Sequence, residues 1–211
     1  MKTLPKKMGL YFIIDGMYTK EFEKFTRMAI RNDVSIIQYR DKDASLESMK
    51  ENAQRMQKLT SQSSTCFIVN DNPGVALFSH ADGIHVGQSD ENYLEVRKHM
   101  PDKIIGVSTM TLEESTEAEN LGADYLGIGP IFVTQTKPDT PPPIGLNNLK
   151  EIVDNTTIPI VAIGGINAEN LESILKTGVH GVAIISAILT APDPEIEIQK
   201  IQDIIKKYNK K

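Results

Sequence analysis

The sequence predicts a single (β/α)8 barrel that spans residues 1–211. Its 211 residues suit one α/β barrel, a fold that commonly takes roughly 200–250 residues. Eight short apolar runs recur along the chain, and amphipathic segments separate them. Strands that alternate with helices predict a parallel sheet, and about eight strands close it. A doubly wound open sheet also alternates but usually has fewer strands, so we favour the barrel.

Strands are predicted where a short apolar run stands between polar or turn-forming residues. In chain order these runs are Leu10–Ile14, Ser35–Tyr39, Cys66–Val69, Gly83–Val86, Ile104–Val107, Tyr125–Ile128, Ile160–Ile163 and Gly181–Ile185. Helices are predicted where apolar residues recur three and four positions apart. The clearest are Lys20–Arg31, Leu46–Leu59, Leu112–Leu121, Leu146–Asn155, Asn167–Thr177 and Pro194–Tyr208.

Several residues mark where the predicted helices begin and end. Thr111, with Glu114 three positions later, predicts a capping box at a helix N-terminus. Gly122 and Gly178 follow two predicted helices, where a left-handed glycine commonly ends the helix.

Composition narrows the class of protein. The formal net charge of -5 argues against non-specific nucleic-acid binding, which needs clustered positive charge. The apolar run Leu10–Ile14 is too short for a signal peptide or a membrane span, so we expect a cytoplasmic protein without a membrane partner. Cys66 is the only cysteine, and its apolar neighbours predict a buried side chain.

Polar residues follow seven of the eight predicted strands. Barrel enzymes carry their active sites at the carboxyl ends of the strands, so these residues predict the site. The residues that stand there are Gln38, Tyr39, Arg40, Asp41, Lys42, Asn70, Asp71, Asp90, Ser108, Thr134, Gln135, Thr136, Lys137, Gly164, Gly165 and Ser186.

Asp71 and Asp90 predict a metal site because they follow neighbouring strands. Such strands lie about 4.8 Å apart, and two carboxylates can share one Mg²⁺ while its other positions hold water and phosphate. The alternative is that Asp71 caps the next helix, whose first turn would hold Pro73. No cluster of Cys and His residues points to zinc or iron.

Two groups of residues predict anion binding. Gly164 and Gly165 precede a predicted helix and Ser186 follows the next strand, which is where barrels often bind phosphate. Arg40, Lys42 and Lys137 add positive charge.

Strand alternation places Gln38 and Arg40 on one face and turns Tyr39 towards the helices. The four histidines carry little signal, and we interpret His85, which lies within a strand, as a satisfied core residue. No Ser–His–acid arrangement is indicated.

The chain resembles the thiamine phosphate synthase family over nearly its whole length and in the family's order. The matching segments are Gln38–Lys42, Asn70–Asp71, Ala81–Asp90, Gly106–Thr109, Gly127–Phe132, Thr134–Lys137, Ala162–Ile166 and Ile185–Ile188.

The resemblance implies that 4-amino-2-methyl-5-hydroxymethylpyrimidine diphosphate couples to 4-methyl-5-hydroxyethylthiazole phosphate, giving thiamine phosphate and pyrophosphate. It implies a dissociative displacement assisted by one Mg²⁺ on Asp71 and Asp90. The residues implied to hold the pyrimidine diphosphate are Gln38, Tyr39, Arg40, Asp41, Lys42, Asn70, Ser108 and Lys137. Those implied for the thiazole phosphate are Thr134, Thr136, Gly165, Ile185 and Ser186, and Gln135 is implied to bind substrate. Arg40, Lys42, Ser108 and Lys137 would act on the departing group.

Three positions depart from the family pattern. Tyr39 stands where Leu is usual, Asp41 where Glu is usual and Met110 where His is frequent. Two alternatives remain: a thiazole tautomerase, which uses a His where Pro130 stands, and a non-catalytic barrel that binds a thiamine precursor. The oligomeric state stays open, a homo-oligomer included.

Overall fold

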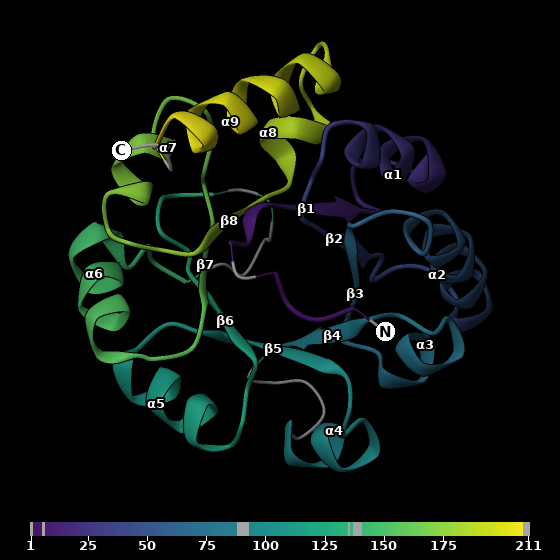
Figure 1. The fold of residues 1–211 in the computed structure, drawn as a ribbon, viewed down its shortest axis with the longest axis horizontal. Coiled ribbons are helices and arrows are strands. Elements are labelled where there is room, and N and C mark those ends of the chain that lie inside the picture. The colour runs from purple at the N-terminus through teal and green to yellow at the C-terminus, as the bar shows by residue number, and fades with distance from the viewer. Residues whose placement is uncertain (1, 6, 88–92, 135, 137–140, 209–211) are drawn as a thin grey trace.

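Eight parallel strands form a closed barrel in chain order, with β1 pairing β8. The structure, a computed structural model, describes residues 2–5, 7–87, 93–134, 136 and 141–208. The helices surround the strands as an outer ring (Figure 1). The predicted (β/α)8 barrel is confirmed.

The strands lie close to the positions that the apolar runs predict. Their bounds are β1 Gly9–Asp15, β2 Ile36–Arg40, β3 Cys66–Asn70, β4 Gly83–Val86, β5 Ile104–Thr109, β6 Tyr125–Ile128, β7 Ile160–Ile163 and β8 Gly181–Ile184. β5 extends to Thr109, so Ser108 lies within the strand. These bounds put the predicted functional residues at one rim of the barrel.

The described helices are α1 Phe22–Arg31, α2 Leu46–Thr60, α3 Pro73–Phe78, α4 Tyr93–His99, α5 Leu112–Asn120, α6 Gly145–Asn155, α7 Leu171–Leu175, α8 Ser186–Leu189 and α9 Pro194–Tyr208. α3, α4 and α8 are not among the clearest predicted helices, and α3 was expected only as a helix with Pro73 in its first turn. They have six, seven and four residues, too few to show a helical period. In the part of the chain that the structure describes, no helix has the length and hydropathy to cross a membrane.

The start of α7 differs from its prediction. The segment Asn167–Thr177 was expected to be helical, but α7 begins only at Leu171. The side chain of Asn167 accepts hydrogen bonds from the backbone N–H of Glu169 and Asn170 at 2.9 and 3.2 Å. Asn side chains compete with helical hydrogen bonds in this way, so the chain makes a turn first. Gly165 therefore does not directly precede a helix, and that part of the prediction is wrong.

The other boundary signals hold. The Thr111 hydroxyl accepts from the N–H of Glu114 at 3.2 Å, while the Glu114 carboxylate accepts from the N–H of Met110 at 2.7 Å. The second half of the capping box thus reaches one residue further back than expected. Gly122 and Gly178 have φ values of 86° and 93°, the left-handed conformation predicted at both helix ends.

Two glycines make room for polar rings inside the barrel. A Cβ on Gly106 would lie 2.1 Å from Cζ of Tyr125, and a Cβ on Gly127 would lie 2.9 Å from Cε1 of His85. Neither glycine has a positive φ, so their role is to permit close approach. Cys66 is buried as predicted, and burial raises the pKa of its thiol to about 12.

Replacing Gly106 with Ala should destabilise the barrel, because the new methyl group would overlap the Tyr125 ring. We expect the free energy of unfolding to fall by roughly 1–3 kcal/mol, as for other overpacked cores. Urea denaturation of the purified protein measures it. The control is Gly74→Ala in α3, where a Cβ meets only Asn72 Oδ1, at 3.3 Å, and no comparable loss is expected. Equal stability of the two variants would contradict this account of the barrel interior.

Candidate functional site

A cavity of about 760 Å³ opens at the carboxyl ends of the strands. Its volume lies in the range of small-molecule sites, roughly 300–1,000 Å³. Ten of the residues predicted for the site line this cavity: Lys42, Asn70, Asp71, Ser108, Thr134, Thr136, Gly164, Gly165, Ile185 and Ser186. The closed barrel thus brings residues that are far apart in the sequence together in one cavity.

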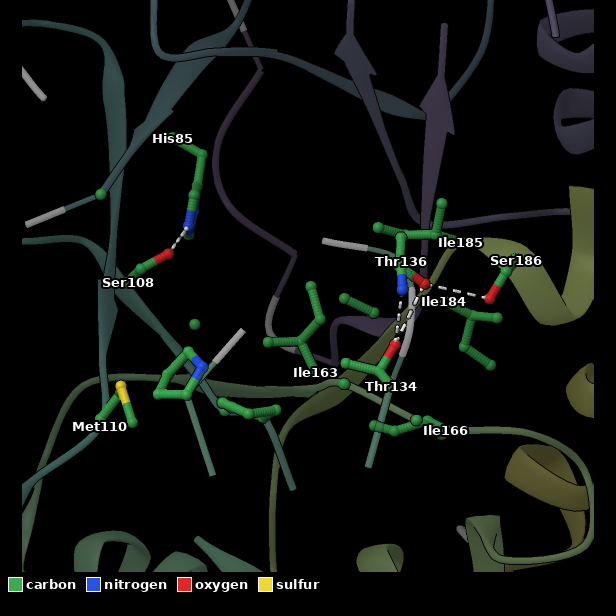
Figure 2. Close-up of a pocket in the computed structure, with 18 of the residues that line it drawn as sticks. His85, Ser108, Met110, Thr134, Thr136, Ile163, Ile166, Ile184, Ile185 and Ser186 are labelled. Carbon is green, nitrogen blue, oxygen red and sulfur yellow. Dashed lines mark hydrogen bonds between the residues drawn. The ribbon is translucent and has the colours of Figure 1, made fainter. Parts of the chain in front are cut away.

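The cavity has two polar sides. His85 and Ser108 lie on one side, while Thr134, Thr136 and Ser186 lie across from them (Figure 2). Ile163, Ile166 and Ile185 lie on the side of the threonines. Figure 2 also places Met110, one of the departures from the family pattern, at the edge near Ser108.

Asp71 is held in a conformation that presents its carboxylate to the cavity. Its φ is 60°, a left-handed value that Asp tolerates better than most residues. Asn72 caps α3 instead, since its side chain accepts from the N–H of Val75 at 2.9 Å. The alternative that Asp71 caps this helix is therefore wrong.

Lys42 lies beside Asp71 at the same rim. The Lys42 ammonium is 3.1 Å from Oδ2 of Asp71, and the two side chains are 54% and 25% exposed. An ion pair so open to solvent contributes little to stability, about 0–1 kcal/mol. It does keep a cation and a carboxylate close together at the mouth of the cavity.

The second-strand residues that precede Lys42 do not line this cavity. Arg40 donates to the buried Asp15 carboxylate, and Asp41 accepts from Lys20 at 2.9 and 3.0 Å. Tyr39 faces the helices as predicted, with its ring centroid 4.9 Å from that of Phe22. In this structure Tyr39 therefore packs on Phe22, Arg40 pairs with a carboxylate and Asp41 pairs with a lysine.

Gln38 is buried inside the barrel below the cavity. Its side-chain amide donates to the Tyr11 hydroxyl at 2.8 Å. Gln38 is not among the residues that line the cavity, and its contact with the pyrimidine diphosphate stays a prediction.

The opposite side of the cavity is built from hydroxyl groups. Thr134 Oγ1 lies 3.1 Å from Oγ1 of Thr136, which in turn lies 3.3 Å from Oγ of Ser186 (Figure 2). Thr136 is buried. Three hydroxyls so close together can donate jointly to a phosphate, because each carries one rotatable hydrogen.

Gly164 and Gly165, which follow β7, allow other parts of the backbone to come close on this side of the cavity. Gly164 and Gly165 have φ values of 98° and 67°, and a Cβ on Gly165 would lie 2.6 Å from the Val133 carbonyl oxygen. Both the backbone conformation and the space therefore require glycine. This geometry, rather than a helix terminus, explains the Gly164–Gly165 pair.

His85 is the functional residue that the sequence analysis missed. It lines the cavity from β4 and makes hydrogen bonds at both ring nitrogens, to Tyr125 at 3.0 Å and Ser108 at 2.9 Å. The ring nitrogens of His85 are hydrogen-bonded, as the sequence interpretation expected, but the residue lines the cavity. The alternation of β4 was the available signal, since every second residue of a barrel strand points inward.

Three predicted site residues, Asp90, Gln135 and Lys137, lie outside the described residues. The described side chains include no group of three or more His, Cys, Asp or Glu residues that could hold a metal. Mg²⁺ needs only one or two carboxylates besides water and phosphate oxygens. Asp71, with the Asn70 side chain beside it in the same cavity wall, offers such hard oxygen ligands, so the described part of the site fits Mg²⁺.

Residues 10–188 match the protein family described as thiamine monophosphate synthase. The chain is 40% identical over 208 residues to a thiamine-phosphate synthase of Archaeoglobus fulgidus, covering 99% of this chain and 98% of that one. It is 45% identical over 174 residues to a thiamine-phosphate synthase of Shouchella clausii, covering 82% and 83%.

A solved structure, a thiamine phosphate pyrophosphorylase from Pyrococcus furiosus, superposes with a TM-score of 0.89 at 38% identity. The match covers 96% of this chain and 98% of that one. A 3-hexulose-6-phosphate synthase superposes with a TM-score of 0.66 at 18% identity over 93% of this chain and 99% of that one. This second likeness shows the fold alone.

Asn72→Ala should destabilise the protein because α3 loses its N-terminal cap. The expected fall in the free energy of unfolding is about 1 kcal/mol, the usual loss for a capping side chain. Urea denaturation measures it, and Asn72→Asp, which keeps a capping oxygen, is the matched control. If Asn72→Ala unfolds at the same urea concentration as the unmodified protein, Asn72 is not the cap.

Proposed function

The chain belongs to the thiamine monophosphate synthase family and is a transferase that forms thiamine phosphate, and we propose that the cavity at the carboxyl ends of the strands performs this reaction. One observation carries the proposal. The cavity joins a charged side, with Lys42 and Asp71, to a hydroxyl side, with Thr134, Thr136 and Ser186. A reaction between a diphosphate and a monophosphate needs two such anion sites in one space.

The two substrates are the pyrimidine diphosphate and the thiazole phosphate named above. The bond between the pyrimidine methylene carbon and its diphosphate oxygen breaks, and pyrophosphate leaves with the bonding electrons. The thiazole ring nitrogen then gives its lone pair to the methylene carbon. No proton has to move, so the protein contributes charge and orientation more than acid–base catalysis.

The charged side holds the diphosphate. Lys42 provides a point charge for its oxygens, and the Asn70 and Ser108 side chains in the same wall orient the pyrimidine diphosphate. By the family resemblance, Lys137 would also contact the diphosphate and Asp90 would be a second metal ligand. Asp71 and Asp90 would hold one Mg²⁺, which neutralises charge that develops on the departing pyrophosphate.

Arg40 and Asp41, which precede Lys42, each form an ion pair next to this side of the cavity. The Arg40 guanidinium is ion-paired with the buried Asp15 carboxylate at the end of β2, two residues before Lys42. Asp41 anchors Lys20 near the same rim. We propose no substrate contact for Tyr39, because its ring packs on Phe22. Direct contacts of Arg40 and Asp41 with the diphosphate remain predictions from the family resemblance.

The hydroxyl side holds the thiazole phosphate. Thr134, Thr136 and Ser186 turn their hydrogens from one another to the phosphate oxygens, while Gly165 lets the backbone approach closely. Ile185 provides an apolar contact for the thiazole ring. Gln135 stands between Thr134 and Thr136 in the sequence. Because both sides line one cavity, the two substrates can be held with the ring nitrogen facing the methylene carbon.

A coupling assay tests the proposed function. Purified protein with both substrates and Mg²⁺ should release thiamine phosphate and pyrophosphate in equal amounts. A thiazole tautomerase would act on a thiazole phosphate alone, and Pro130, which lines the cavity where a tautomerase has its His, offers no proton-transfer group. A non-catalytic barrel would bind the substrates without releasing pyrophosphate, and that result would refute the proposal.

Asp71→Gly should abolish most coupling activity and leave the fold intact. Glycine suits the left-handed φ at this position, so the free energy of unfolding should change by less than about 1 kcal/mol. The carboxylate for Mg²⁺ is lost, and turnover should fall by roughly 10²-fold or more. Steady-state kinetics with and without EDTA measure it. Asn72→Ala, the neighbouring cap variant, should show the reverse pattern, and full activity of Asp71→Gly in EDTA would rule out the metal assignment.

Ser186→Ala should weaken the binding of thiazole phosphate and spare that of the pyrimidine diphosphate. One lost hydrogen bond to a charged phosphate corresponds to about 1.5–3 kcal/mol, or roughly 10- to 150-fold in affinity. Calorimetric titration of each substrate separately measures the two affinities. Thr190→Ala changes a hydroxyl of the same cavity wall that bonds the Ser186 carbonyl oxygen at 2.8 Å, so it serves as the control. Unchanged thiazole phosphate affinity in Ser186→Ala would show that the phosphate binds elsewhere.

A further inference from the structure

A chain of hydrogen bonds runs through the barrel interior and ends at the cavity. Gln38 Nε2 donates to the Tyr11 hydroxyl at 2.8 Å, and that hydroxyl lies 2.8 Å from the hydroxyl of Tyr125. The Tyr125 hydroxyl lies 3.0 Å from Nδ1 of His85. His85 Nε2 lies 2.9 Å from Oγ of Ser108, the contact that Figure 2 shows as a dashed line. We call these five residues, which come from β2, β1, β6, β4 and β5, the buried chain.

The buried chain is a built feature of the barrel. Gln38, Tyr11 and Tyr125 are all nearly inaccessible to solvent. The space for the Tyr125 and His85 rings depends on Gly106 and Gly127, as described above. Buried polar groups are costly unless they are hydrogen-bonded, so a barrel that keeps these in place of apolar residues has to satisfy them together.

Such a chain has a direction, because each hydroxyl has a single hydrogen. If Gln38 donates to Tyr11, then Tyr11 donates to Tyr125 and Tyr125 donates to Nδ1 of His85. The neutral imidazole then carries its proton on Nε2 and donates to Ser108. The Ser108 hydroxyl oxygen then accepts from His85, and the hydroxyl hydrogen does not donate to His85. In the opposite direction Ser108 would donate to Nε2, and Gln38 would accept from Tyr11 through its amide oxygen.

Burial keeps both phenols in the protonated form that the chain requires. Desolvation raises the pKa of Tyr11 and of Tyr125 above the ordinary phenol value. Each therefore supplies one O–H and one acceptor at neutral pH, and neither interrupts the chain as a phenolate. The amide group of Gln38 is then the end that sets the direction.

We propose that Gln38, Tyr11 and Tyr125 are positioning residues that hold His85 as its Nε2–H tautomer and make Ser108 a hydrogen-bond donor towards the pyrimidine diphosphate. The assignment rests on the proposed function only for the identity of that substrate. A donor at Ser108 suits a diphosphate oxygen, which accepts hydrogen bonds and has none to give. The reversed chain would turn a lone pair of Ser108 towards the same anion.

The tautomer of His85 is measurable without any substrate. In protein labelled with nitrogen-15 histidine, a protonated and an unprotonated ring nitrogen resonate far apart, so each tautomer has its own pattern. The spectrum is taken near pH 8, about 1.5 units above the ordinary histidine pKa. The chain has four histidines, and His85→Gln identifies the signals of His85 by their loss. The unmodified protein should show Nε2 protonated and Nδ1 unprotonated.

Two variants at Gln38 test whether this residue sets the direction. In Gln38→Glu the spectrum is recorded at rising pH, because burial raises the pKa of a carboxyl group. Once the carboxyl ionises it only accepts, so Tyr11 turns its hydrogen towards it, the chain reverses, and His85 should become the Nδ1–H tautomer. In Gln38→Met no donor remains, and both tautomers should be populated. Tyr93→Phe removes a phenol of α4 that lies outside the buried chain, so it should leave the His85 signals unchanged. An unchanged Nε2–H tautomer in both Gln38 variants would overturn the proposal.

Kinetics separate a directional role from a merely structural one. Gln38→Glu and Gln38→Met should lower kcat/KM measured with varied pyrimidine diphosphate by about tenfold, the factor for one hydrogen bond of ordinary strength. The KM for thiazole phosphate should stay the same, because its site lies across the cavity. An equal rise in the KM of both substrates would show general damage to the barrel and contradict the proposal. If the unmodified protein formed no thiamine phosphate while the tautomer changed as expected, the proposed function would fail and the directional chain would stand.

Discussion

The site depends on the parallel closure of the barrel between β1 and β8. The backbone N–H groups of Met8 and Gly9 both donate to the His180 carbonyl oxygen, at 3.0 and 3.1 Å, where the two strands meet. Gly181 permits this contact, since a Cβ there would lie 2.8 Å from Cβ of Met8. Closure puts the carboxyl ends of all eight strands at one rim. Lys42, Asp71, Ser108 and Ser186, which are far apart in the sequence, thereby line one cavity.

Much of this arrangement is predictable from the sequence because it depends on periodicity. Apolar runs and helical spacing place the strands almost to the residue, and the order of the strands then places the residues that follow them. Local turn chemistry is less predictable. Asn167 accepts from nearby N–H groups and delays α7, while Asn72 takes the capping role that the alternative gave to Asp71. In the first case a side chain competes with the helical hydrogen bonds, and in the second either of two neighbouring residues could cap the helix, so only the backbone conformation decides the outcome.

Side-chain pairing across strands is harder still to predict. Arg40 has the chemistry of a phosphate ligand, yet its guanidinium bonds Asp15, which stands at the end of a different strand. His85 was correctly expected to be satisfied, but its partners Tyr125 and Ser108 come from two other strands, and its ring faces the cavity. No pattern within a single strand reports such pairs. Gly106 and Gly127 are the sequence signal of these pairs, because a ring from another strand comes close to each of these glycines.

The central claim is that one cavity holds two phosphorylated groups at once, one on each side. Phosphorus-31 NMR tests it on the unmodified protein, with paramagnetic Mn²⁺ in place of Mg²⁺ and with pyrophosphate and thiazole phosphate as non-reacting ligands. The account predicts that both ligands bind together, with strong broadening of the pyrophosphate signals near Asp71 and weaker broadening of the thiazole phosphate signal across the cavity. If each ligand displaced the other, or if the thiazole phosphate were broadened more strongly than pyrophosphate, the two-sided account of the site would be contradicted.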